Sequence, residues 1–197
     1  MTNASVAADP ARRALLAVIG QGRALTPREW ARESGLPKAV VETHLEALEN
    51  SGVLHVRWQG PHRYFAAART ADAPPPRVTT GPRDPAMRRA RVCYGHLGGD
   101  FAVRLFDRLA ARDLITVSND AVRLTAAGAT FVDGIGVDRE RGKPCLDWSN
   151  RRSHLAGPLG NAFLQRFYEW GWAERDPDSR LVSFSPTGEV GFDALFG

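Results

Sequence analysis

A proline-rich segment near the middle of the chain restricts its fold more than any other sequence feature. Residues 70–85 contain five prolines and almost no apolar side chains. Such a composition favours an extended chain that cannot join a packed core. We therefore expect two domains, residues 1–69 and 86–197, joined by a linker over residues 70–85.

Two helices are predicted at the start of the first domain. Asp9 and Pro10 are typical of a helix start, and the apolar spacing continues to residue 19. The segment 26–29, Thr-Pro-Arg-Glu, is the pattern of a capping box and predicts a second helix. This helix is short, because Gly35 ends it.

A third helix and a hairpin follow in the same domain. The helix is predicted over residues 37–49, and the runs 53–58 and 63–67 predict two strands around a turn at 59–62. We expect four apolar side chains to form the buried stripe of the helix: Val40, Val41, Leu45 and Leu48.

This order of elements is that of a winged helix-turn-helix, in which the second helix of the motif enters the major groove of DNA. We expect helix residues to face base edges and hairpin residues to reach phosphates or the minor groove: Lys38, Ala39, Glu42 and Thr43 on the helix, and Arg57, His62 and Arg63 on the hairpin. Because the helix also carries three glutamates, an alternative is a winged helix that binds protein instead of DNA.

The distribution of charge agrees with a polyanion partner for the first half. The net charge is +2 over residues 1–73 (9 basic, 7 acidic), +4 over 74–95 (5 basic, 1 acidic) and −2 over 96–197 (12 basic, 14 acidic). Double-stranded DNA is the expected partner, met as a homodimer because palindromic half-sites need two recognition helices.

The second half contains an internal repeat. His96-Leu97-Gly98-Gly99 recurs as His154-Leu155-Ala156-Gly157, and apolar positions follow at the same offset of 58 residues. Thr125 and Ser185 are predicted N-caps of a closing helix in each copy. We expect two helix-hairpin-helix units, each like half a winged helix, separated by an irregular stretch over residues 134–150. The fold class is α+β, mainly helical.

Three stretches of the first domain resemble the ArsR-type winged-helix regulators: LTPREWARESGLP (25–37), THLEAL (43–48) and GPHRYF (60–65). The second half resembles the extension of a longer ArsR-like subgroup through RVCYGHLGG (91–99) and PCLDW (144–148). The resemblance implies a transcription regulator, with repression the expected effect. The metal-sensing members carry paired cysteines in the winged domain, but residues 1–92 contain no cysteine, so metal sensing at the family's usual sites is not expected, and neither a metal nor another cofactor is predicted. The linker also occupies the place of the usual dimerisation helix, so the dimer interface must lie elsewhere.

Reactive and aromatic side chains concentrate in the second domain, where they are the expected sensor of an unknown effector: Cys93, His96, Cys145, Asp147, Trp148 and His154. Four interpretations stay open. They are core packing, a redox pair with a thiol activated by Arg91 and His96, a mixed-ligand metal site, and an organic ligand near Trp148 and Trp172. A spacing of three would place Cys93 and His96 on one helix face.

The remaining expectations concern compartment and class. No stretch reaches the ~18 uncharged apolar residues of a spanning helix, and the first ten residues lack a signal-peptide pattern, so a cytoplasmic protein without membrane contact is expected. An enzyme is not expected, because no third residue that could orient a catalytic pair accompanies Cys93 and His96. A thiol-dependent enzyme is the remaining alternative.

Overall fold

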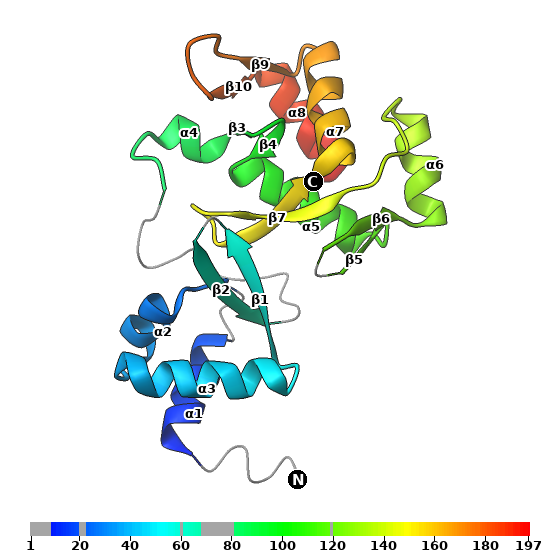
Figure 1. Ribbon diagram of the computed structural model, residues 1–197. Helices are drawn as coiled ribbons and strands as arrows, with labels where there is room; N and C mark the ends of the chain where they lie inside the picture. Colours follow the sequence, from blue (N-terminus) through cyan, green and yellow to red (C-terminus); the bar gives the residue numbers. More distant parts are fainter. Residues whose placement is uncertain (1–8, 20–22, 60, 68–80, 119) are drawn as a thin grey trace. The chain divides into compact units, whose positions relative to one another are not determined.

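The computed structural model describes residues 9–19, 23–59, 61–67, 81–118 and 120–197 (Figure 1). It divides into two compact units, residues 1–77 and 78–197. Most of the predicted linker, residues 70–80, lies outside the described residues. None of the helices that are described is long and apolar enough to cross a membrane.

The first unit begins with three helices, α1 (Pro10–Ile19), α2 (Pro27–Ser34) and α3 (Lys38–Asn50). The predicted caps are confirmed. Asp9 accepts a hydrogen bond from the Ala11 amide (2.9 Å), and Thr26 and Glu29 form a reciprocal capping box. Gly35 ends α2 in the left-handed conformation that glycine adopts without strain (φ 72°).

A hairpin of β1 (Leu54–Gln59) and β2 (His62–Ala67) completes this unit. Leu25 pairs with Phe65 through two backbone hydrogen bonds (3.0 and 2.8 Å), an isolated bridge along the edge of the hairpin. The Trp30 indole of α2 donates to the carbonyl of Phe65 (3.4 Å). These contacts fix the hairpin against the helices, around a buried core: Leu15, Val18, Leu25, Trp30, Val41, Leu45, Leu48, Leu54 and Phe65.

Two expectations for this unit are wrong in detail. Val40 is exposed (37%), because Val41, Leu45 and Leu48 alone face the core at the i, i+4, i+7 spacing. Gln59 and His62 belong to the strands rather than to the turn, since they pair directly with each other and leave a two-residue loop.

The second unit opens with the short helix α4 (Pro85–Arg89) and then repeats one order of elements twice: hairpin, helix, hairpin, helix. The first copy consists of β3 (Arg91–Cys93), β4 (His96–Gly98), α5 (Asp100–Ala111), β5 (Ile115–Val117), β6 (Val122–Leu124) and α6 (Ala126–Gly134). The second consists of β7 (Lys143–Asp147), β8 (Arg152–Ala156), α7 (Gly157–Glu169), β9 (Ala173–Arg175), β10 (Val182–Phe184) and α8 (Pro186–Phe196).

The leading hairpin of each copy corrects the predicted helix-hairpin-helix unit. The stretch 134–150 is not irregular throughout, because residues 143–147 form β7. Strands of three to five residues with mixed composition do not stand out in the sequence. The predicted caps are confirmed, since Thr125 and Ser185 each accept from the amide three residues later (3.0 Å).

Backbone hydrogen bonds join the two copies at isolated bridges. Ala90, before the first leading hairpin, accepts from Val182 of the second copy (3.2 Å), and Gly142, before the second leading hairpin, pairs with Val122 of the first copy (2.9 and 3.0 Å). Helix α5 also packs on β8, and α7 on β4. These reciprocal contacts relate the copies by a pseudo-two-fold arrangement and give them one shared core.

Aromatic side chains from both copies fill much of that core. Phe101 stacks on Phe184 (ring centroids 4.1 Å apart), and Phe167 contacts Phe192 and Phe196 of α8. The ring cluster thus joins Phe101 of the first copy to the rings of the second, and the two copies share one hydrophobic core.

Candidate functional site

The first candidate site is the outer face of α3. Lys38, Ala39 and Thr43 are exposed over its first two turns, directly after the Gly35 turn, while Glu42 is half-buried. The Lys38 ammonium pairs with the Glu42 carboxylate (3.2 Å), so part of the charge of each is compensated. The sequence-predicted helix residues therefore do lie on one face.

The hairpin residues are less exposed than expected. Arg63 pairs with Glu49 near the C-terminal end of α3 (3.0 Å), and its guanidinium lies over the rings of Trp58 and Phe65. Arg57 is half-buried, and His62 is exposed beside the turn. Arg63 is thus a packed residue of the hairpin as well as a cation.

Sequence reasoning missed two cations on α2. Arg28 and Arg32 are both exposed and, one turn apart, share a face of the helix that precedes the turn. Their i, i+4 spacing is visible in the sequence and could have identified them.

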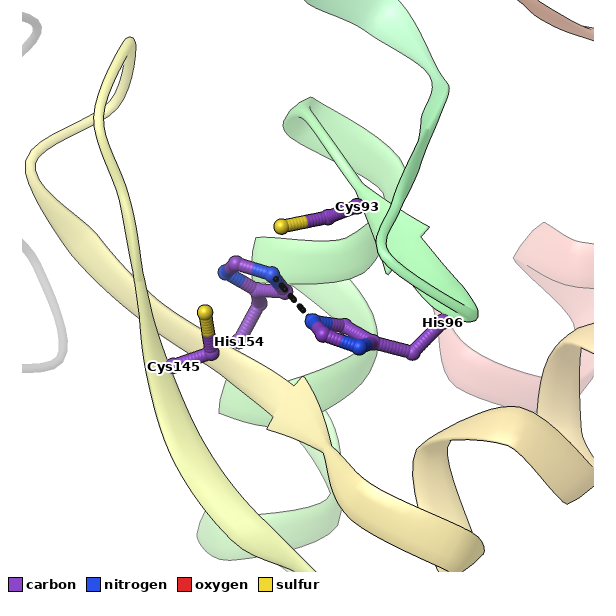
Figure 2. Close-up of side chains that lie close together, drawn as sticks. All are labelled: Cys93, His96, Cys145 and His154. Carbon is purple, nitrogen blue, oxygen red and sulfur yellow. Dashed lines mark hydrogen bonds between the residues drawn. The ribbon is translucent and has the colours of Figure 1, made fainter. Parts of the chain in front are cut away.

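The second candidate site is a cluster of two cysteines and two histidines, the Cys2His2 cluster, formed by Cys93, His96, Cys145 and His154. Figure 2 shows these side chains pointing toward one another from two hairpins, β3–β4 and β7–β8. One sulfur or nitrogen atom of each residue lies within 4.8 Å of those of the other three. The Nε2 atoms of the two histidines are 3.0 Å apart, and both rings are buried.

Each copy of the repeat contributes one cysteine and one histidine in the same relation. Cys93 lies directly opposite His96 across the first leading hairpin, and Cys145 lies opposite His154 across the second. Cys93 and His96 are therefore on neighbouring strands and not on a helix face, which corrects that expectation. The offset between the copies is 58 residues for the histidines but 52 for the cysteines, because the second hairpin is six residues longer. This change of offset hid the correspondence in the sequence.

The two thiols of the cluster are free. A hydrogen bond from Cys145 lowers the pKa of Cys93 most, against burial, and contacts with His154 and His96 lower it further. The same contact with Cys93, together with burial, raises the pKa of Cys145. One thiolate is thus favoured at the cluster. Arg91, the expected thiol activator, is engaged elsewhere.

Arg91 instead pairs with Asp147. Its guanidinium donates to an Asp147 oxygen (2.7 Å) that also accepts from the Gly99 amide (2.7 Å), and the second oxygen accepts from Ser149 and Asn150. Although burial raises the pKa of Asp147, Arg91 and these hydrogen bonds hold it well below its usual range. Asp147 therefore ties the two copies together rather than joining the cluster. Trp148 lies under the Arg91 guanidinium (5.5 Å).

The comparison with curated proteins gives a relative that spans both units. The chain is 28% identical over 210 aligned residues to the uncharacterized HTH-type transcriptional regulator YdfF of Bacillus subtilis (strain 168), and the match covers 96% of this chain and 93% of the relative. No protein-family model matches the chain, and no solved structure matches it. The similarity supports a transcription regulator.

Proposed function

We propose that the protein is a DNA-binding transcription regulator of the ArsR type, which binds operator DNA as a homodimer and represses transcription. The similarity to an HTH-type regulator over nearly the whole chain supports this class over a thiol-dependent enzyme. The observation that carries the proposal is the exposed N-terminal face of α3 directly after the Gly35 turn. In a winged helix-turn-helix this is the surface that enters the major groove.

The side chains on this surface suit distinct roles. Thr43, with Ala39 beside it, would face base edges. The Lys38 ammonium would leave the Glu42 carboxylate and pair with a DNA phosphate instead. Arg28 and Arg32 of α2 would contact the sugar-phosphate backbone, which the first helix of the motif crosses. His62, with Arg57 and Arg63 behind it, would extend the contact through the hairpin.

Two further parts of the proposal concern the whole protein. Two α3 helices must be presented about 34 Å apart to read adjacent half-sites, which requires a dimer. The second unit would receive the signal that changes DNA affinity, because it carries the Cys2His2 cluster.

A gel-shift or anisotropy assay with duplexes from the region upstream of the protein's own gene tests DNA binding. We expect salt-dependent binding in which Lys38→Ala weakens all sequences alike and lowers the salt slope by about one. Thr43→Ala should instead reduce the preference for the operator over random DNA. Arg123→Ala, an exposed arginine of the second unit, is the matched control and should leave binding unchanged.

A protein-binding winged helix is the second candidate function. It is favoured by the glutamates at positions 42, 46 and 49 of α3 and by the exposed Trp58 (67%) at the end of the hairpin. Folded dimer that shows no salt-dependent DNA binding would support this candidate and contradict the first.

A further inference from the structure

We propose that Cys93, His96, Cys145 and His154 form a tetrahedral binding site for a thiophilic divalent cation of the zinc type. The site lies wholly in the second unit, so it stands whether or not the first unit binds DNA. The expectation of no metal relied on the absence of cysteines from residues 1–92, and the cluster lies beyond them.

The spacing of the four ligand atoms fits such a cation. In tetrahedral zinc sites the bonds are about 2.0–2.1 Å to nitrogen and about 2.3 Å to sulfur, so ligand atoms lie roughly 3.3–3.8 Å apart. The four atoms here all lie within 4.8 Å of one another, and the two imidazole nitrogens are 3.0 Å apart. Shifts of the ligand atoms by up to about one ångström, through side-chain rotation, would complete the tetrahedral geometry.

The donor set selects the kind of cation. Two sulfurs with two imidazole nitrogens favour zinc or related thiophilic ions over magnesium or calcium, which prefer oxygen. The carboxylate of Asp147 does not complete the set, because its oxygens are occupied by Arg91, Gly99, Ser149 and Asn150.

One of the four side chains also carries a buried polar atom without a partner among the described residues. His154 is fully buried, yet among the described residues its Nδ1 has no hydrogen-bond partner. The facing Nε2 atoms of His96 and His154 can share only one proton between them. Buried imidazoles normally have both nitrogens satisfied, whereas a lone pair without a donor is available to a cation.

The position of the cluster indicates what the cation would do. Cys93 and His96 come from one copy of the repeat and Cys145 and His154 from the other. A bound cation would therefore cross-link the two leading hairpins. Because protein atoms fill all four positions, the site is closed, as in structural and sensing sites, and leaves no position for a substrate.

Cobalt(II) provides a direct probe, because its absorption spectrum reports both coordination geometry and thiolate ligation. The reduced full-length protein, stripped with a chelator, would be titrated with Co²⁺ without oxygen and then with Zn²⁺. We expect saturation at one equivalent with the bands of a tetrahedral ion and a thiolate-to-cobalt charge-transfer band, all lost when zinc is added. Zinc should also raise the unfolding temperature in proportion to the logarithm of its free concentration.

Variants assign the ligands. Cys145→Ser and His154→Gln should weaken binding by more than the roughly 10- to 100-fold typical of losing an outer-shell partner. His44→Gln replaces a histidine of the first unit and is the matched control, so its cobalt spectrum and stoichiometry should not change. An equal loss in His44→Gln would contradict the assignment.

The wild-type protein decides the question even if a variant does not fold. One equivalent of zinc should protect both thiols from alkylation. Folded protein with two titratable thiols that gives no tetrahedral cobalt spectrum would overturn the proposal. So would a Cys93–Cys145 disulfide that forms under mild oxidant at the same rate with and without zinc, which would identify a redox pair instead.

Discussion

At the scale of single residues, the buried ion pair of Arg91 and Asp147 links the two copies of the repeat. The side chains are 1% and 0% exposed, and the ion pair joins the first strand of one copy to the last residue of β7 in the other. Removing one partner leaves the other charge buried and uncompensated, which is far more costly than losing a surface pair.

Asp147→Asn should therefore destabilise the second unit by about 3–5 kcal/mol, because Arg91 keeps its charge in the core. Urea unfolding followed by circular dichroism measures the change. Asp133→Asn, which removes the exposed partner of Arg139, is the matched control and should change stability little. Equal effects of the two substitutions would show that the Arg91 pair is no stronger than a surface pair.

The pair also predicts a pH dependence. Because the pKa of Asp147 is lower in the folded protein than the ~3.9 expected when unfolded, its contribution is complete above that pH and declines as the pH falls toward the folded pKa. The difference in unfolding free energy between wild type and Asp147→Asn should be constant from about pH 5 to 7 and shrink below about pH 4. If the difference in unfolding free energy stayed unchanged at about pH 3, the lowered pKa of Asp147 would be contradicted.

The residue scale also shows what the sequence could identify at the Cys2His2 cluster. The residue types and the repeated histidines were visible, and all four cluster members were among the predicted sensor residues. Their convergence was not predictable, because it depends on strand pairing and on a hairpin that is six residues longer in the second copy.

At the scale of elements, closing helices α6 and α8 approach the preceding segment at equivalent glycines. A Cβ on Gly128 would lie 1.8 Å from the carbonyl oxygen of Leu114, and one on Gly188 would lie 2.1 Å from that of Trp172. Neither contact can relax without moving the backbone. This close approach explains why the repeated sequence keeps glycine in a helix, where it is otherwise unfavourable.

Gly128→Ala and Gly188→Ala should thus each lower the melting temperature strongly, since the helix must separate from the segment beneath it. Gly134→Ala, at the end of α6 with nothing within 4 Å of its added Cβ, is the matched control. It should be neutral or stabilising by up to about 1 kcal/mol. A Gly128→Ala protein as stable as Gly134→Ala would contradict the packing described for α6.

The start of α2 gives a prediction for the first unit. Thr26→Ala removes the side chain that accepts from the Glu29 amide and should cost about 1 kcal/mol, whereas Thr26→Ser retains the hydroxyl and most of the stability. Thermal unfolding of the two variants checks this. A serine variant as unstable as the alanine variant would show that the methyl group, and not the cap, is important.

At the scale of the whole molecule, each unit has its own hydrophobic core, and the two clusters share no residue. We expect residues 78–197, expressed alone, to unfold cooperatively with a midpoint close to that of the same transition in the full chain. Calorimetry of the fragment and the intact protein compares them. The fragment 1–142, which removes the second copy of the repeat, should not fold beyond the first unit, because Ala90 would lose its partner Val182 and the shared core would lose Phe163, Phe167 and Phe192.

The sequence by itself determined the features that arise within a few residues: helix starts at Asp9, Thr26, Thr125 and Ser185, the Gly35 stop, and the repeat. Caps and turns are formed by neighbours in the chain, so their patterns can be read directly. Only the tertiary structure decided which distant residues meet. The packing of the two copies against each other brings Cys93 to Cys145 and Arg91 to Asp147, and it follows from burying two apolar faces together rather than from any local pattern.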